Sequence, residues 1–394
     1  VAEAPASTNA GPAFGYHAGS GNSGNATSLL DRIDFSNDTG TATSKGPLPQ
    51  IRGASAAVAT PSYGYVVRGF GPPGGNPSSS VDRIDLSNDT SITPAITNFT
   101  ASRSWSDGVG NISYGYFIGS NPGVITTIDR LDFSNDTAQG SPRGTLSAAG
   151  VYITSQAGNQ NYGYWVGGLT GTPSYQSVSR VDRMDYSNDS ATASPKGPLN
   201  QKRISHGGTG NADYGWHGGG RIFPSDPMSS VERLDYSSDT STLSPKGPIS
   251  VARSEVKATG DASYGWWVGG MNAARSTVDR VDFSNDTATA SVRGPLTSAR
   301  GYVGSMSAKA NALPQTNTPA IAAPVQPPFP YPEQLYNPAS NKLHGYIGGG
   351  SSGPKSSVDR ITFANDTATA TPKGSLTAAK YRRSGTGNID YGYI

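Results

Sequence analysis

Carboxylates are the side chains of this sequence best suited to acid–base or metal chemistry, and they recur in register. One aspartate returns in each of six consecutive repeats, and a threonine replaces it in the seventh: Asp34, Asp85, Asp132, Asp185, Asp235, Asp282 and Thr362. An active site needs different residues that converge at one place. Copies of one residue spread over a repeated scaffold instead favour a structural role, either in a turn or beside the arginine of the same strand.

The histidines give no better candidate for a metal or catalytic site. His17 and His217 occupy the same strand position in two repeats that are not adjacent, so they lie too far apart to share a metal ion. The absence of cysteine excludes disulfides, thiolate ligands and a cysteine nucleophile. The sequence has no phosphate-binding loop or H-E-x-x-H motif. It therefore predicts a protein that is not an enzyme, with no catalytic residue, cofactor or metal.

The recurring carboxylates belong to a longer repeat that decides the architecture. An aromatic-Gly doublet is followed, about 17 residues later, by a near-copy of V-D-R-I-D-F-S-N-D-T. The acidic-Arg pairs are Asp31-Arg32, Asp82-Arg83, Asp129-Arg130, Asp182-Arg183, Glu232-Arg233, Asp279-Arg280 and Asp359-Arg360. Their spacings are 51, 47, 53, 50, 47 and 80 residues. A period near 50 residues is typical of propeller blades and similar repeated units.

The repeat at residues 264–300 shows the strands most clearly. Residues 264–268 and 278–283 are expected to be strands, the Ser-Asn-Asp-Thr segment that follows to be a turn, and a third strand to lead to Leu296. Arg300 then opens a fourth strand. Four strands in each of seven repeats predict an all-β, seven-bladed β-propeller of four-stranded blades. We expect one domain over residues 1–394, with repeats near 14–62, 63–113, 114–161, 162–213, 214–263, 264–343 and 344–390.

These segments resemble the kelch repeat family. A hydrophobic strand ending in Gly-Gly, as at Val166-Gly167-Gly168 and Val268-Gly269-Gly270, precedes a strand ending near Asp, a turn, and an Arg before the next innermost strand. The tryptophan expected after the turn is replaced by small residues such as Ala191 and Ala288. The resemblance covers nearly the whole chain and implies a kelch-like fold, not an activity.

An arginine four residues after a large apolar residue opens several of the innermost strands. These arginines could ring the mouth of the channel and attract an anionic ligand. The favoured alternative is that each one pairs with a carboxylate and with backbone carbonyls of its own sheet. The channel-mouth candidates are Arg52, Arg103, Arg203, Arg253 and Arg300, and Gly150 breaks the series.

The turn segment also forms a recurrent N-x-S/T sequon. In a secreted protein, glycans on these hairpin tips would coat one face. The favoured alternative is that Asn-Asp suits the turn and that the following Thr suits the strand. The glycosylation candidates are Asn37, Asn88, Asn135, Asn188, Asn285 and Asn365, and only the fifth repeat departs, at Ser238.

Two features break the repeat. There are eight aromatic-Gly strands for seven acidic-Arg strands, so Tyr391–Ile394 competes with Phe14–Tyr16 for one place. The extra strand is displaced, adds to a neighbouring subunit, or belongs to a longer array. A Pro-rich inserted arm at 305–341 is either a surface insertion or an arm that docks on a neighbour. The assembly candidates are Tyr391, Tyr393, Ile394, Phe14, Tyr16, Phe329, Tyr331, Leu335 and Tyr336.

Composition limits the partners of this chain. The net charge of +2 gives no indication of binding to nucleic acid or to an anionic membrane. No apolar run approaches the roughly 18 residues that a membrane-spanning helix needs, so we expect no membrane insertion. The chain begins with Val1 and not with Met, which indicates a processed chain or a fragment.

The first functional hypothesis is a non-enzymatic extracellular or virion structural protein, a propeller subunit of a fibre, filament or tail appendage. Its partners would be further copies or neighbouring structural subunits. The Y-G-Y and S-N-D-T segments are loosely similar to repeats of phage tail and appendage proteins. The alternative is a lectin-like module that binds surface glycan through the unequal loops at 71–80, 169–177 and 221–229. A carbohydrate-active enzyme resembling galactose oxidase is least favoured, because that family's copper site requires a cross-linked cysteine.

Overall fold

In the computed structural model the chain divides into two compact units, Val1–Ala320 and Ile321–Ile394. In the first unit the structure describes residues 10–21, 26–71, 76–119, 125–148, 154–171, 174–271 and 275–315. In the second unit it describes the backbone of five short strands. Each helix in these described stretches is a three-residue 3-10 turn. None of them has the length and apolar character that a membrane-spanning helix needs.

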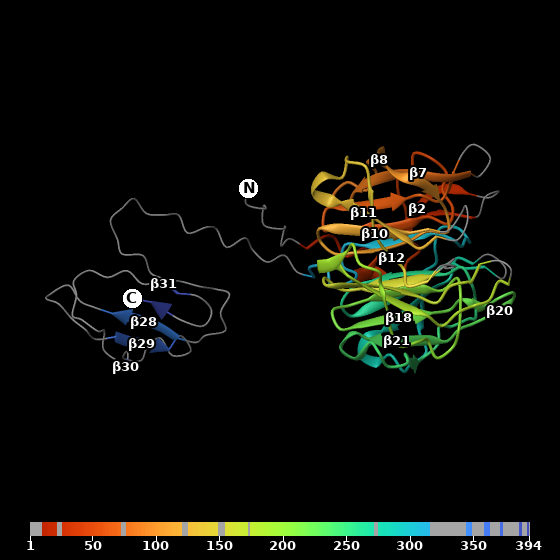
Figure 1. The fold of residues 1–394 in the computed structure, drawn as a ribbon. Helices are drawn as coiled ribbons and strands as arrows, with labels where there is room; N and C mark the ends of the chain where they lie inside the picture. The colour runs from red at the N-terminus through yellow and green to blue at the C-terminus, as the bar shows by residue number, and fades with distance from the viewer. Residues whose placement is uncertain are drawn as a thin grey trace. The chain divides into compact units, whose positions relative to one another are not determined.

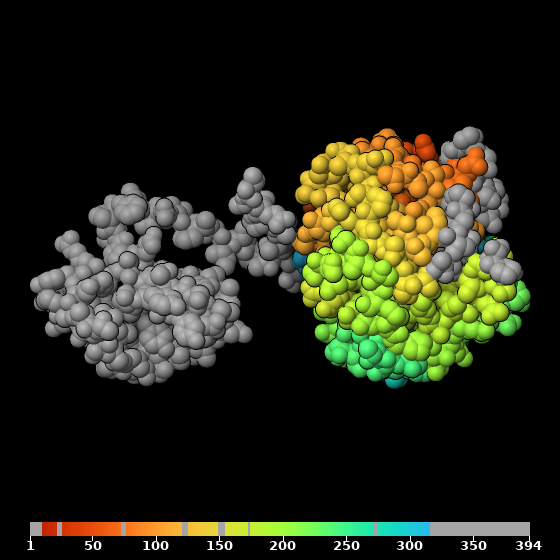
Figure 2. All heavy atoms as spheres, viewed as in Figure 1, coloured from red at the N-terminus to blue at the C-terminus, as the bar shows by residue number. Residues whose placement is uncertain are grey.

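The first unit is a β-propeller with six blades, which are antiparallel sheets of four main strands (Figure 1). From inner to outer strand, the first blade is β27 (Gly304–Ser307), β1 (Phe14–Ser20), β2 (Thr27–Asp34) and β3 (Thr43–Ser44), and the second is β4 (Ala56–Ala59), β5 (Tyr63–Val67), β7 (Asn76–Asp85) and β8 (Ile92–Arg103). In the same order, the third blade is β9 (Asp107–Gly110), β10 (Tyr114–Ile118), β11 (Thr127–Asp132) and β12 (Ser141–Thr145), and the fourth is β13 (Ser155–Gly158), β14 (Tyr162–Val166), β15 (Val181–Asp185) and β16 (Ser194–Pro195). The fifth blade is β17 (Gly207–Gly210), β18 (Tyr214–Gly218), β21 (Val231–Asp235) and β22 (Ser244–Lys246), and the sixth is β23 (Lys257–Gly260), β24 (Tyr264–Val268), β25 (Val278–Asp282) and β26 (Ser291–Arg293). Consecutive blades form adjacent orange, yellow and green regions of the surface in Figure 2.

Short elements complete the blades. The strands β6 (Phe70–Gly71), β19 (Arg221–Ile222) and β20 (Asp226–Pro227) lie in the loops after the second strands of two blades. The 3-10 turns are η1 (Phe35–Asn37), η2 (Phe133–Asn135), η3 (Tyr186–Asn188), η4 (Tyr236–Ser238) and η5 (Phe283–Asn285). Each 3-10 turn follows directly after the third strand of its blade.

The six inner strands surround a central channel. They neighbour one another in the order β4, β9, β13, β17, β23 and β27, and β27 lies beside β4. Their sequences are rich in small residues, such as Ala-Ala-Val-Ala in β4 and Gly-Gly-Thr-Gly in β17. Small side chains are needed because six backbones converge on one axis and leave little room between them.

The prediction of seven blades was wrong, because the ring closes after six repeats. β27 pairs antiparallel with β1, with Ser307 opposite Gly15 and Gly304 opposite Ala18. In the other blades a tight turn carries the inner strand into its own aromatic-Gly strand, as from β23 to β24. The long insertion after β27 removes that neighbour, and β1 takes its place. In Figure 1 the light blue β27 accordingly lies beside the red and orange N-terminal strands.

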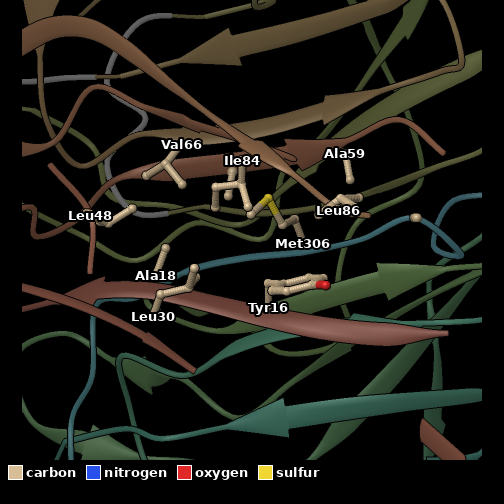
Figure 3. Close-up of a cluster of buried hydrophobic side chains, with 11 residues drawn as sticks. Tyr16, Ala18, Leu30, Leu48, Ala59, Val66, Ile84, Leu86 and Met306 are labelled. Atoms are coloured by element: carbon tan, nitrogen blue, oxygen red, sulfur yellow. The ribbon is translucent and has the colours of Figure 1, made fainter. Parts of the chain in front are cut away.

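Apolar packing holds the closing strand in place. Met306 is buried and packs with Tyr16, Ile84 and Leu86 in a cluster that joins the first two blades (Figure 3). On the neighbouring residue of β27, the Ser305 hydroxyl lies 2.9 Å from Nδ1 of His17. The closure therefore rests on side-chain contacts as well as on the strand ladder.

The segment after β27 covers one end of the channel. The Asn311 amide donates to the Gly210 carbonyl at 2.9 Å, and the Gly158 amide donates to Asn311 Oδ1 at 3.2 Å. Gln160 Nε2 donates to the Asn311 carbonyl at 3.1 Å. These bonds reach blades on the other side of the ring from β27. Residues 308–315, which we call the plug, thus cross the end of the channel where the first and second strands of each blade are joined.

The recurring residues build the interfaces between blades. In the six blades, the arginine of the acidic-Arg pair forms an ion pair with the Asp of the Ser-Asn-Asp-Thr or equivalent turn in the next blade, at 2.7–3.0 Å. The sixth pair, Arg280 with Asp38, closes the circle. In each of the six blades, the second aromatic of the aromatic-Gly-aromatic segment donates to the same Asp, as Tyr65 does to Asp136 at 2.8 Å. Tyr and Trp suit this position because each has an apolar body and one polar hydrogen.

The carboxylate that follows in the motif has a local role. Asp34 precedes η1, and its Oδ1 accepts hydrogen bonds from the Ser36 amide at 2.9 Å and the Ser36 hydroxyl at 2.6 Å. The same contacts recur at Asp85, Asp132, Asp185, Asp235 and Asp282. The turn-forming role predicted for this series is confirmed in all six blades.

The seventh repeat lies in the second unit, outside the ring. There β28 (His344–Gly348), β29 (Val358–Thr362) and β30 (Thr371–Pro372) form one sheet in that order. β31 (Thr386–Gly387) pairs with β32 (Gly392–Tyr393). The eighth aromatic-Gly strand therefore pairs within its own unit, whereas Phe14–Tyr16 belongs to β1, between β2 and β27.

Candidate functional site at the channel mouth

The channel-mouth arginines of the sequence analysis are buried and paired. Their residues are at most 6% exposed, and each faces the acidic residue of the acidic-Arg pair in its own blade. Arg52 lies 2.7 Å from Asp82, Arg253 lies 2.6 Å from Asp279 and Arg300 lies 3.0 Å from Asp31. Arg203 pairs with Glu232, and Arg103 lies 3.6 Å from Asp129. The structure shows the favoured alternative, in which these arginines join strands of one sheet.

The blade that lacks this arginine uses other residues. Asp182 is paired with Arg180 at 2.9 Å and accepts a hydrogen bond from the Ser147 hydroxyl. Burial raises the pKa of the Asp182 carboxyl, and these two partners oppose that shift. A local substitute therefore balances the buried carboxylate of this blade.

The end of the channel opposite the plug is called the mouth. Immediately after these arginines, the chain turns inward at the mouth. The residue two positions after the arginine has a left-handed backbone in each case: Ala54, Trp105, Ser205, Glu255 and Tyr302, with φ of 50–60°. Non-glycine residues rarely adopt this conformation, which costs on the order of 1–3 kcal/mol each. Backbone hydrogen bonds hold it, because the Tyr302 amide donates to the Glu255 carbonyl and the Ala54 amide to the Tyr302 carbonyl.

The glycine doublets pack against the same connections. Gly269 and Gly270 have φ of 63° and 124°, which favours glycine. A Cβ on Gly269 would lie only 2.2 Å from the Arg300 carbonyl oxygen. The doublet therefore lets the loop after the second strand approach the connection that leads to the next inner strand.

A cavity lies among the five left-handed residues. Its empty volume is about 290 Å³, including space open to solvent, and a separate cavity with an empty volume of about 400 Å³ lies at the plug side of the channel. The mouth cavity is lined by Ala54, Trp105, Ser106, Asp107, Ser205, Glu255, Val256, Lys257 and Tyr302. Trp105 and Tyr302 form its aromatic wall, with ring centroids 5.1 Å apart. Ala54 and Val256 add apolar surface, and the other lining residues are polar or charged.

Two acid–base pairs balance the charge of this mouth cavity. Lys257 forms an ion pair with Asp107, whose other oxygen accepts from the Thr154 hydroxyl at 2.9 Å. Arg221 Nη2 lies 3.2 Å from Glu255 Oε1. Burial raises the pKa values of the Asp107 and Glu255 carboxyls, and the adjacent cations oppose both shifts. The lining, together with Arg221 beside it, therefore holds two negative and two positive groups when both carboxyls are ionised.

The rim of the mouth carries an exposed aromatic pair. Tyr175 and Phe223 are 44% and 37% exposed, and their ring centroids lie 6.3 Å apart. They come from the loops after the second strands of two adjacent blades. The Phe223 amide donates to the Ser177 hydroxyl at 2.8 Å, which ties the two loops together.

The histidines of the propeller are buried and do not form a metal site. His206 and His217 have ring centroids 6.1 Å apart, and His17 lies in another blade. In the part of the chain that the structure describes, no group of three or more His, Asp or Glu residues is placed to hold a metal ion. His344 begins β28 in the second unit.

Burial of His17 predicts a pH-dependent contribution to stability. Burial and the nearby Arg300 lower the pKa of His17 to about 3, from 6.5. The unfolded chain therefore binds a proton that the folded chain rejects, and stability falls as pH decreases below about 6.5. Between pH 7 and pH 5 the loss is about 2 kcal/mol for this group, at about 1.4 kcal/mol per pKa unit. Urea denaturation would measure the free energy of unfolding of the wild type and of His17→Gln at both pH values. The advantage of the wild type should fall by this amount between pH 7 and pH 5, and an unchanged difference between the two proteins would contradict the prediction.

The remaining sequence candidates are placed as follows. Asn37, Asn88, Asn135, Asn188 and Asn285 are exposed in or beside the turns, so glycosylation stays a prediction for them. Phe14 and Tyr16 belong to β1, and Tyr393 belongs to β32. Asn365, Phe329, Tyr331, Leu335, Tyr336, Tyr391 and Ile394 lie outside the described residues.

The sequence interpretation missed the mouth residues. It singled out the recurring arginines, whereas the candidate site is formed by the residues two positions later. Those positions differ in every described blade, from Ala54 to Trp105 to Glu255. The signal available in the sequence was that these positions vary although the arginines two residues earlier recur. The convergence of these positions on one cavity became evident only with the ring closed.

Comparisons with known proteins give a fold and no family. No family model matches the chain, and no curated protein matches it. Among solved structures, the one titled "Structure of YjhT" is similar with a TM-score of 0.57 and 12% sequence identity. The likeness covers 74% of this chain and 99% of that one. At this level of identity it shows a shared β-propeller fold and nothing about activity.

Proposed function

We propose that this chain is a non-enzymatic structural subunit of an extracellular or virion assembly, and that its propeller contributes adhesion through the loops at the mouth. The observation that carries the proposal is the exposed pair of Tyr175 and Phe223 on two joined loops. Exposed aromatic side chains that are held in place offer large contact area at low entropic cost. Surface glycan is the ligand class that such a platform suits, because sugar rings present apolar C–H faces.

The charged groups of the repeat support a non-catalytic role. The recurring arginines are paired with recurring carboxylates, within a blade or between blades, and the remaining recurring carboxylates accept hydrogen bonds in turns. Such groups stabilise the scaffold and are not free to take part in proton transfer. The loops after the glycine doublets differ in length and sequence, as expected for recognition on a repeated scaffold.

Removing the rim aromatics should weaken adhesion without unfolding the propeller. In a glycan array and in binding to glycan-coated surfaces, Tyr175→Ala and Phe223→Ala should each lower affinity about tenfold, since each removes one contact worth about 1.4 kcal/mol. Val292→Ala is the matched control, because Val292 is 60% exposed on the outer strand β26. Unchanged binding by both rim variants would refute the proposed adhesion surface.

A further inference from the structure

We propose that the cavity at the plug side of the channel is a closed chamber that binds about two water molecules as fixed parts of the fold. This chamber is lined by residues of all six inner strands and of the plug. The inference goes beyond the proposed function and does not depend on it. It is carried by the backbone edges that face the chamber, by two buried side chains without partners, by the size of the chamber and by the closure of both its ends.

The inner strands turn an unpaired backbone edge toward the channel. Each inner strand lies at one end of its sheet, so only one of its edges pairs with another strand. The other edge carries the amide and carbonyl groups of alternate residues. The plug reaches two of these groups, since the Gly158 amide donates to Asn311 Oδ1 and the Gly210 carbonyl accepts from the Asn311 amide.

The same alternation points further backbone groups into the chamber. Gln156 and Gly208 lie two residues before Gly158 and Gly210 in the same strands, so their amides and carbonyls face the same way. Both residues are buried and line the chamber. Ordered water is the usual partner of buried backbone groups that protein atoms do not reach.

Two side chains of the lining also have polar atoms without partners. Gln156 and Thr209 are 7% and 2% exposed, and among the described residues neither Gln156 Oε1 nor Thr209 Oγ1 has a hydrogen-bond partner. A buried acceptor or hydroxyl that stays unsatisfied loses the hydrogen bonds it made in water. A water molecule both donates and accepts, so it can bond to a side-chain oxygen and to a backbone group together.

The size and charge of the chamber select water over a larger or charged ligand. About 30 Å³ of the chamber is open to the centres of water molecules. One water needs about 10–15 Å³ of such space, together with two to four polar partners. The chamber therefore has room for about two waters. None of the described residues that line it is charged, so an ion would lose its hydration without a compensating partner.

An ion pair closes the chamber on the side of the mouth. Lys257 lies on β23 and Asp107 on β9, and these strands are three places apart in the ring of six inner strands, so they face each other across the channel. Their ion pair therefore forms a strut across it. The Thr154 hydroxyl holds the strut by donating to the other carboxylate oxygen of Asp107 at 2.9 Å. The chamber begins at the next residues of the two strands, Gly108 and Ala258.

The plug closes the other end. Ala310 and Leu313 line the chamber and are 6% and 4% exposed. Water between the strut and the plug can exchange with solvent only when one of them moves. The channel is then not a route for ligands, and recognition is left to the loops at its rim.

Deuteron magnetic relaxation dispersion on the full chain, immobilised in a cross-linked gel, counts the long-lived waters and measures their residence time. Gln156→Met removes the amide but keeps the length of the side chain, and Thr209→Val removes the hydroxyl but keeps the shape. Each should lower the count by about one, because a water needs at least two polar partners. Gln50→Met makes the first change at an exposed position and should leave the count unchanged.

A second variant tests the strut. Asp107→Asn combined with Lys257→Met removes both charges, so no buried charge is left unpaired. The residence time should fall on the order of tenfold, because exchange no longer requires the ion pair to break. Arg280→Ala breaks an ion pair between blades, away from the channel, and should leave the residence time as it is in the wild type.

A high-resolution crystal structure with a rubidium soak identifies what the chamber holds. Electron density within hydrogen-bonding distance of Gln156 Oε1, without anomalous signal from rubidium, would support the inference. A dry chamber, a rubidium ion in it, or equal counts of long-lived waters in the wild type, Gln156→Met and Thr209→Val would overturn it. An unchanged residence time in the strut variant would show that the mouth end is not closed by this ion pair.

Discussion

A chain that ends before β27 should fail to form the propeller, whereas a chain that ends at Ala320 should form it fully. The first truncation, after Arg300, removes the inner strand of the first blade together with Met306 and the plug. The second removes only the unit Ile321–Ile394. The short form should lose its cooperative thermal transition, because β1 has no inner partner and the ring stays open.

Circular dichroism melting and limited proteolysis would compare the two forms. The chain ending at Ala320 should melt within a few degrees of the full chain's propeller transition and give a protease-resistant core of the same size. If it is unfolded instead, the seventh repeat contributes to the ring and the six-bladed closure is wrong. Met306→Asp in the full chain is a further control, since it keeps the strand but places a charge in the closing cluster.

Replacing Arg253 by Ala should lower the free energy of unfolding by about 3–5 kcal/mol, because it leaves a buried carboxylate without its partner. Both side chains of the Arg253–Asp279 pair are 0% exposed. Arg253 also donates to the carbonyls of Gly269 and Trp267 at 2.7 and 3.1 Å. Urea denaturation measures the loss, and Arg280→Ala is the comparison, with an expected loss of about 1 kcal/mol for a partly exposed pair.

A double variant identifies the cause of that loss. Arg253→Met combined with Asp279→Leu removes both charges, so it should be more stable than Arg253→Ala alone. Equal stability of the single and double variants would show that the hydrogen bonds to the two carbonyls dominate, and not the buried charge.

The blade itself could be predicted from the sequence, because its signals are local. The aromatic-Gly strand, the acidic-Arg strand and the Asn-Asp turn lie within one repeat, and their pairing follows from their order. The role of Asp282 as a turn acceptor also follows, since Ser284, the donor, lies two residues away. The pairing of the inner arginines with carboxylates of their own sheet could also be predicted, because each of these ion pairs joins two strands of one blade.

The number of blades and the site could not be predicted in this way, because both depend on contacts between distant residues. Counting acidic-Arg strands treats every repeat as a blade, whereas closure depends on which inner strand reaches β1. The five mouth residues come from five blades and meet only in the closed ring. The one sequence signal of closure was the 80-residue spacing. It was interpreted as an insertion in a blade, although the inserted residues follow an inner strand.

The pairing of β1 with β27 also determines when the protein can finish folding during synthesis. Gly15 and Ser307 are paired in the native sheet, so the first blade remains incomplete until nearly 300 further residues have been made. At roughly 5–20 residues per second, this delay lasts about 15 to 60 seconds. Throughout that time β1 presents an unpaired edge to other nascent chains. Ribosome spacing and chaperone access should therefore influence the yield of this propeller more than they influence folds whose first strands pair at once.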